Sequence, residues 1–233
     1  MRFGATIGGA DLKVTCAVVV LGALVQTACT PQTALMAAAV PSGTTSVLLS
    51  QTERVRDDNR RQIVAYEQAR DWTGLARLAD ENLKRDPHTP DWRLIAGYAY
   101  TQLGQHAQAA AQYAEAVRLE PDMTLYWTLL AQSWRAAGQP ERALAVLDNA
   151  SLARRDDPQI PVLQGDIRLD QGRATAAIQA YRTALAIDER HVPAWRGLER
   201  AHRASGNSDE AVRAGREAQR ITESVATKPA ASR

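Results

Sequence analysis

Apolar residues recur every three or four positions along two consecutive stretches in the middle of the chain. The first stretch carries Trp92, Ala96, Ala99, Tyr100 and Leu103, and the second carries Ala109, Ala110, Tyr113, Ala116 and Val117. This spacing places the apolar side chains on one face of a helix. The pattern predicts two amphipathic helices joined at Gly104, because glycine adopts the left-handed conformation that often ends a helix.

The two-helix pattern repeats at a fixed distance. Four glycines stand 34 residues apart, namely Gly104, Gly138, Gly172 and Gly206. Alanines follow each glycine in the same register, at Ala109, Ala143, Ala177 and Ala211 and again at Ala116, Ala150, Ala184 and Ala218. A constant period of this size indicates stacked repeats, because one such unit cannot bury its apolar face alone. With Gly104 at position 15, the frames are 56–89, 90–123, 124–157, 158–191 and 192–225.

At these positions the chain resembles the tetratricopeptide repeat family, whose pattern is W-x2-L-G-x2-Y, then A-x3-F, then A and P. The second frame matches it at Gly97, Tyr100, Ala109, Tyr113, Ala116 and Pro121. The third and fifth frames have Trp127 and Trp195 at the tryptophan place, whereas the fourth has Pro161. The first frame departs most, with Arg70 for the turn glycine. The resemblance implies an all-α fold, a right-handed superhelical solenoid of about five antiparallel helix pairs over residues 56–225.

Two features predict how the helix pairs pack. Small residues at repeated positions let neighbouring helices approach closely, so a bulky residue at Ala143 or Ala177 would overpack the interface. The fifth frame reverses one pairing, with Glu199 at the glycine place and Gly215 at the aromatic place. Its second helix is rich in arginine, which predicts a solvent-facing end to the stack.

Composition narrows the classes of function. The net charge is only +2, and the 28 basic residues include just three lysines, so no nucleic-acid partner is predicted. The chain has no GxSxG motif, no glycine-rich phosphate loop and no acid–base cluster on one predicted face. The four histidines, at His88, His106, His191 and His202, lack metal-ligand spacing. We therefore expect no enzyme activity, cofactor, metal or small-molecule substrate.

The N-terminus is typical of an exported bacterial protein. Arg2 and Lys13 precede an apolar run over residues 14–25, which is too short to span a bilayer as a helix. A positive segment before a short apolar one predicts a secretory signal. The following residues resemble a lipobox that ends at Cys29, although Gln26 stands where that pattern has an apolar residue. We expect residues 1–28 to be a signal peptide and Cys29 to be lipidated.

Two alternatives to lipidation stay open at this point. A general signal peptidase could cleave later, for example after residues 37–39. Alternatively, the segment is an uncleaved anchor or a misassigned start. Residues 29–55 show no sustained helical or strand period and are predicted to be a flexible, lipid-anchored linker. Residues 226–233 are predicted to be a disordered tail.

The resemblance implies a binding surface on the first helix of each pair. In this family, positions 2, 5, 9 and 12 of that helix line a concave groove. The central and C-terminal frames place these residues there: Leu94, Tyr98, Leu125, Thr128, Gln132, Arg135, Val162, Asp166, Leu169, Arg196, Arg200 and Arg203. The set predicts an exposed apolar middle and a basic end, which would suit a peptide with an apolar core and an acidic end.

Less specific explanations exist for both halves of this surface. The three arginines could be a solvated helix face, paired with Glu199 or Asp166. The apolar residues could be buried by the superhelix, or the frame could be off by one. The lysine–asparagine set with which some family members bind acidic chaperone tails is missing, so chaperone-tail binding is not predicted.

The sequence thus favours a non-enzymatic scaffold that binds protein or peptide ligands. Its layout is similar to tetratricopeptide lipoproteins of pilus and secretion systems, which implies a place in the bacterial cell envelope, lipid-anchored at the outer membrane or periplasmic. One alternative is a periplasmic factor for polysaccharide export or cell-wall enzymes. Another is a cytosolic adaptor or regulator, with residues 1–40 as a start-site error.

Overall fold

The computed structural model describes residues 57–226, which lie within one compact unit of the chain, Leu48–Arg233. Within the described range it holds ten α-helices and no strand. The helices form five antiparallel pairs: α4 (Asp57–Ala69) with α5 (Trp72–Arg85), α6 (Pro90–Gln102) with α7 (His106–Leu119), α8 (Thr124–Ala136) with α9 (Pro140–Ala153), α10 (Gln159–Asp170) with α11 (Ala174–Ile187), and α12 (Val192–Ala204) with α13 (Ser208–Ala226). The expected all-α solenoid of helix pairs is confirmed.

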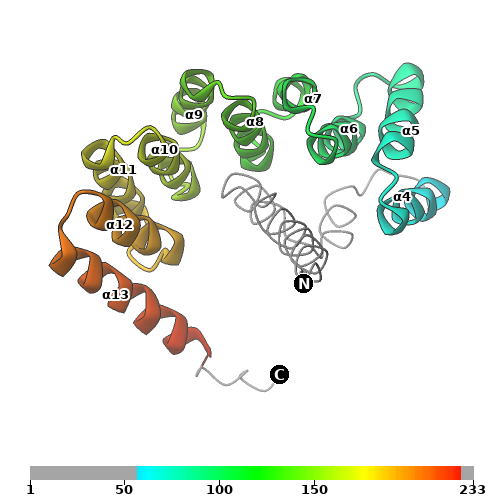
Figure 1. The fold of residues 1–233 in the computed structure, drawn as a ribbon. Helices are drawn as coiled ribbons and strands as arrows, with labels where there is room; N and C mark the ends of the chain where they lie inside the picture. The colour runs from blue at the N-terminus through cyan, green and yellow to red at the C-terminus, as the bar shows by residue number, and fades with distance from the viewer. Residues whose placement is uncertain (1–56, 227–233) are drawn as a thin grey trace, which may run out of the picture. The chain divides into compact units, whose positions relative to one another are not determined.

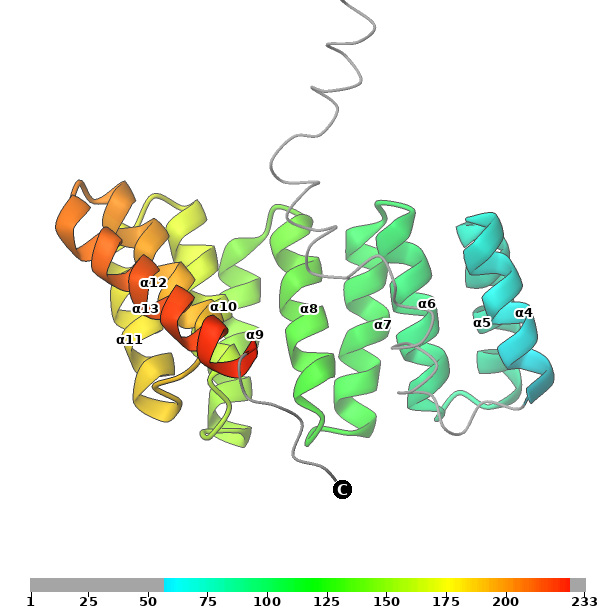
Figure 2. The same cartoon turned by 90° about the horizontal axis from the view of Figure 1, so that it is seen from below.

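The pairs follow one another along a curved row (Figure 1). The first helix of each pair lies on the inner side of the curve, and the second helices α5, α7, α9 and α11 lie on the outer side. Seen from below, neighbouring helices run side by side along the row (Figure 2). Each helix packs against the helices before and after it, and α10 also contacts the inner helices α8 and α12. The inner helices therefore form one continuous concave layer.

The four ladder glycines end the first helix of their pairs. Their φ angles are +72° to +79°, and a Cβ at any of them would meet no atom within 4 Å. Backbone conformation rather than crowding therefore requires glycine at these turns. The amide after each glycine closes the turn, as when Gln105 donates to the carbonyl of Tyr100 at 2.9 Å. Arg70 takes the same place in the first pair with φ +53°, a conformation that costs a residue with a Cβ about 1–2 kcal/mol.

Two tyrosine rings lie directly on glycine backbone. A Cβ on Gly97 would come within 2.5 Å of the Tyr113 ring. A Cβ on Gly165 would come within 2.6 Å of the Tyr181 ring, and one on Gly197 would come closer still. Both tyrosines are fully buried. These glycines let the helices approach closely enough for the ring to fill the space between them.

The last pair reverses this arrangement. Glu199 projects from α12 at the place where α6, α8 and α10 have a small residue, and its carboxylate lies against Gly215 of α13. The large side chain and the small one have exchanged helices, so the space between the helices is still filled.

The repeated alanines are buried, as the period predicts. Ala143 and Ala177 have no exposed surface, and Ala211 and Ala218 of the last pair are 3% and 4% exposed. A larger side chain at such a position has no free volume to enter. Overpacking costs about 1–3 kcal/mol, so Ala143→Leu should destabilise the stack by that amount.

Tryptophan joins successive pairs through a hydrogen bond. The Trp127 indole donates to the carbonyl of Pro121 at 2.7 Å, and the Trp195 indole donates to that of Glu189 at 2.8 Å. At the first boundary the guanidinium of Arg93 takes the same role toward Pro87 at 3.2 Å. Each bond ties the start of an inner helix to the turn that precedes it.

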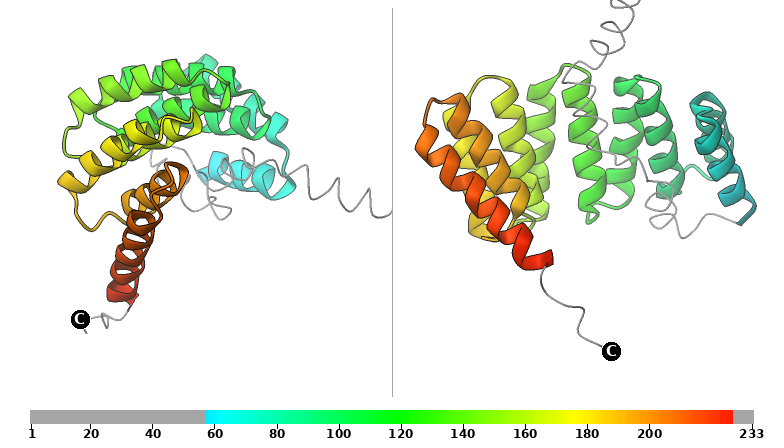
Figure 3. Two further views of the ribbon diagram at one scale, coloured as in Figure 1. Left: turned by 60° about the vertical axis from the view of Figure 1, so that its left-hand side comes forward. Right: turned by 60° about the horizontal axis from the view of Figure 1, so that its bottom comes forward.

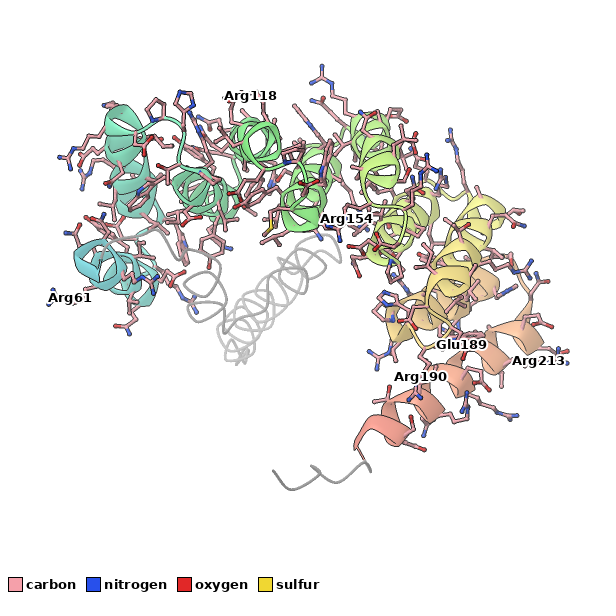
Figure 4. All side chains as sticks on the ribbon, turned by 180° about the vertical axis from the view of Figure 1, so that it is seen from behind. Arg61, Arg118, Arg154, Glu189, Arg190 and Arg213 are labelled. Carbon is pink, nitrogen blue, oxygen red and sulfur yellow. The ribbon has the colours of Figure 1, made fainter. Side chains whose placement is uncertain are left out.

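The C-terminal helix α13 presents a charged outer face. It is 19 residues long, against 14 for each of the four other outer helices. Arg213 pairs with Glu210, and Arg220 pairs with Glu217. Figure 4 shows Arg213 pointing away from the helix stack. The predicted solvent-facing end of the stack is present here.

Candidate functional site

The candidate site is the concave face formed by α6, α8, α10 and α12, seen from two further directions in Figure 3. The predicted groove residues all lie on these four inner helices. Their exposure differs from one end of the face to the other, and this difference decides what the face offers to a partner.

The N-terminal part of the face is closed. Leu94 and Tyr98 of α6 are 2% and 7% exposed. The Tyr98 ring meets the ring of Trp72 edge to face, with centroids 5.7 Å apart. The expectation that these two residues are exposed is therefore wrong.

Part of the middle is also buried. Val162 is 3% exposed and belongs to the apolar cluster around Tyr181 and Leu198. Thr128 is 8% exposed, and its hydroxyl donates to the carbonyl of Leu125 in its own helix. The expected exposure of Val162 is wrong because α10 packs against α11 and α12 at this position.

The remaining middle residues stay partly accessible. Leu125 and Gln132 of α8 and Leu169 of α10 are half-buried. These three residues form the accessible part of the predicted apolar middle. It is narrower and more C-terminal than the sequence suggested.

A charged network occupies the C-terminal half of the face, and Asp166 of α10 is at its centre. Its Oδ1 accepts hydrogen bonds from the Tyr181 hydroxyl at 2.7 Å and from Arg200 Nη2 of α12 at 2.6 Å. Burial raises the pKa of the Tyr181 hydroxyl well above its usual range, and the charge of Asp166 raises it further. Partial burial lowers the pKa of Arg200, but the charges of Asp166 and its neighbours outweigh this and raise it. Tyr181 therefore acts as a neutral donor, and the ion pair is held in one geometry.

A second ion pair lies beside the first. Arg135 of α8 donates through Nε to Asp170 Oδ2 of α10 at 2.6 Å, and its side chain is 17% exposed. Asp166 and Asp170 are four residues apart and so lie on one face of α10. Arginines from α8 and α12 thus flank two carboxylates on the helix between them.

The third predicted arginine pairing lies within one helix. Arg203 donates to Glu199 at 2.6 Å. Arg196 is exposed and forms no hydrogen bond or ion pair with the part of the chain that the structure describes. The alternative explanation, pairing with Asp166 and Glu199, therefore holds for Arg200 and Arg203 but leaves Arg196 uncompensated.

Sequence reasoning missed Asp170 and Tyr181 as members of this network. One signal for the ion pair was present, because Asp166 and Arg200 occupy the same position of consecutive frames, 34 residues apart. Opposite charges at one repeat position of neighbouring inner helices can meet across the concave layer. Tyr181 was identified only as the aromatic of its frame, and its hydroxyl was given no partner.

The chemistry of this face is that of binding. Its carboxylates are engaged by arginine or tyrosine, and no group of three or more potential metal ligands occurs among the described residues. Cys29 and the predicted signal and linker lie outside the described residues. None of helices α4 to α13 combines the length and apolar character needed to cross a membrane.

Comparison with known proteins agrees with the fold. The family described as tetratricopeptide repeat matches residues 61–124, 96–159, 128–192 and 162–226. Superkiller complex protein 3 of Mus musculus is 29% identical over 131 residues, and that of Homo sapiens is 28% identical over 129 residues. These matches cover 56% and 55% of this chain but only 8% of each relative.

Solved structures of similar fold are also found. A crystal structure of MamA has a TM-score of 0.60 at 21% identity, covering 74% of this chain and 98% of that one. A tetratricopeptide repeat protein of Thermus thermophilus, TTC0263, has a TM-score of 0.53 at 19% identity, covering 69% and 88%. At these identities the likeness concerns the fold alone. Since the family match covers most of the chain, including every described helix pair, the protein belongs to the tetratricopeptide repeat family.

Proposed function

We propose that this protein is a non-enzymatic scaffold of the bacterial cell envelope, and that its concave face binds a segment of another protein. The observation that carries the proposal is the composition of the accessible C-terminal half of that face. Half-buried Leu125 and Leu169 lie on the helices that also carry Arg135 and Asp170, and exposed Arg196 lies on α12 with no compensating charge among the described residues. Such a surface suits a peptide with a few apolar side chains and an acidic end.

The proposed anchor is a lipid on Cys29. Two or more acyl chains bury enough methylene groups to hold a protein stably at a membrane, and residues 29–55 would serve as the linker to the helices. The layout supports a role in assembling a multi-protein machine such as a pilus or a secretion system. The names of its sequence relatives also refer to a multi-protein complex. The alternatives are a periplasmic factor for polysaccharide export or cell-wall enzymes, and a cytosolic adaptor.

Two triple variants test the binding surface with a matched control. Arg196→Gln, Arg200→Gln and Arg203→Gln together remove charge from the concave face. Arg213→Gln, Arg216→Gln and Arg220→Gln remove the same charge from the outer face of α13. In each set two arginines have an ion-pair partner within the described helices and one has none.

Site-specific photo-crosslinking in the native host provides the measurement. A crosslinker at Gln132 should capture a defined partner, whereas one at exposed Ala111, on the outer helix α7, should not. The first triple variant should abolish capture while helicity is preserved, and the α13 triple should leave it unchanged. Equal capture by both triples would refute the concave site.

The anchor is tested separately. Mass spectrometry of the mature protein should show an acylated Cys29 as the first residue. An intact Met1 in the soluble fraction would favour the cytosolic alternative, and a start within residues 37–40 would favour a cleaved periplasmic protein.

A further inference from the structure

The boundary between the third and fourth helix pairs lacks the hydrogen bond found at the other boundaries between described pairs. Arg93, Trp127 and Trp195 occupy one repeat position and donate to the preceding turn. Pro161 occupies that position in α10 and has neither a side-chain donor nor an amide N–H. The inner helix α10 is also one residue shorter than α6, α8 and α12.

Packing across this boundary is also reduced. Helices α9 and α10 approach each other over fewer residues than the helices that meet at the other three boundaries. The apolar contact that remains is one cluster, in which Leu147 and Ala150 of α9 meet Ile160, Leu163 and Ile167 of α10. A boundary with less buried contact opens or bends at a lower free-energy cost.

Polar side chains supply much of the remaining connection. Gln164 donates to Asp148 at 2.8 Å, and Gln171 donates to Glu141 at 3.1 Å, both at exposed positions on the outer helix α9. On the concave side, Arg135 of α8 holds Asp170 of α10. Exposed contacts of this kind are individually weak and sensitive to salt.

The next boundary is built differently. The Tyr181 ring is wedged between Gly165 of α10 and Gly197 of α12, and Asp166 binds both Tyr181 and Arg200. The Trp195 indole adds its bond to the preceding turn. The fourth and fifth pairs are therefore joined by buried aromatic packing as well as by charge.

We infer that the boundary between α9 and α10 is a hinge of the concave groove, latched by the Arg135–Asp170 ion pair. The inference rests on the proposed function in one respect, since the groove it widens or narrows is the proposed binding face. Bending at this hinge changes the distance between the accessible residues of α8 and the arginines of α12. Arg135 is itself a groove residue, so an acidic partner that reaches it competes with Asp170 and releases the latch.

Pulsed electron paramagnetic resonance on the full chain tests the hinge without any partner. Four exposed residues on successive outer helices share one repeat position: Ala111, Ala145, Gln179 and Arg213. With Cys16 and Cys29 changed to serine, spin labels at 111 and 145, at 145 and 179, or at 179 and 213 each span one boundary. The three pairs are matched in register, so their distance distributions are directly comparable.

The 145–179 distribution should be wider than both of the others, and high salt should widen it further. Asp170→Asn should also widen it, whereas the control Glu115→Gln, which removes an ion pair within α7, should not. Pro161→Trp should narrow it, because an indole at this place can donate to the carbonyl of Arg155. Three equal widths, or no response to Asp170→Asn, would overturn the hinge. Such a result would leave the crosslinking test of the proposed function untouched, and failure of crosslinking would leave the hinge intact.

Discussion

Two boundaries of the solenoid have the same sequence spacing but are held together by different contacts. Between the second and third pairs, Trp127 packs at the start of α8 and its indole is bonded to Pro121. Between the third and fourth pairs, Pro161 takes the tryptophan place, and glutamine and arginine side chains make the links across the gap. A repeat period therefore specifies that helix pairs stack, but not how stiffly each pair is joined to the next.

The difference divides the described helices into two parts. Helices α4 to α9 lie on one side of the weak boundary, and α10 to α13 lie on the other. The charged network of Asp166, Tyr181 and Arg200 lies wholly in the second part, whereas Arg135 reaches it from the first. A partner that contacts both Arg135 and the arginines of α12 would bind across the hinge.

The largest expected effect comes from removing the apolar contact that remains at the weak boundary. Leu147 is fully buried in the cluster shared by α8, α9 and α10. Leu147→Ala should lower the free energy of unfolding by about 2–5 kcal/mol, as for other buried leucines. It should also split urea unfolding, followed by circular dichroism, into two transitions, because α10 to α13 lose their contact with the rest. Leu152→Ala on the same helix, at a residue 68% exposed, is the control and should change little.

A smaller effect is expected from weakening the strong boundary. Trp127→Ala removes a half-buried ring and the bond to Pro121, and should cost about 2 kcal/mol. If the contrast between the boundaries is correct, the 111–145 spin-label distribution in this variant should become as wide as the 145–179 distribution. An unchanged 111–145 width would mean that the tryptophan bond does not stiffen the boundary.

The turns within pairs provide a third comparison, because they should respond alike on both sides of the hinge. Arg70→Gly relieves a left-handed residue and should stabilise the protein by up to about 1 kcal/mol. Gly172→Ala, at φ +73°, should destabilise it by about 1 kcal/mol. Thermal unfolding followed by circular dichroism measures both. Neither variant should alter the spin-label widths, and a change in width would show that turn strain reaches the boundaries.

The smallest expected effect is a dependence on pH in the second pair. Burial lowers the pKa of His106, at the start of α7, below its ordinary value of about 6.5. The unfolded chain then binds the proton more tightly, so stability present above about pH 6.5 falls as the pH drops through the lower native pKa. His106→Gln should flatten the unfolding midpoint between about pH 7.5 and pH 5.5, and His88→Gln should not. A slope that survives in the His106 variant would assign it to other groups.

Much of the fold followed from a few residue types at fixed spacing. The positive φ angles of Gly104 and Gly138 and the burial of Ala143 are local consequences of the period, and the sequence predicted each of them. The concave face was less predictable. Position 5 of an inner helix holds buried Leu94 in one pair and exposed Arg196 in another. Exposure at one repeat position depends on the neighbouring helices, which differ from pair to pair.

By itself, the sequence determined the all-α class, the helix pairs and the glycine turns, because these depend on backbone conformation and on contacts within 34 residues. Tertiary structure decided which groove residues stay accessible and which arginines are already paired. It also decided that Pro161 marks the weak boundary, since this depends on how α9 and α10 approach each other. Such properties arise from side chains of different helices meeting in space, and the one-dimensional period does not specify those distances.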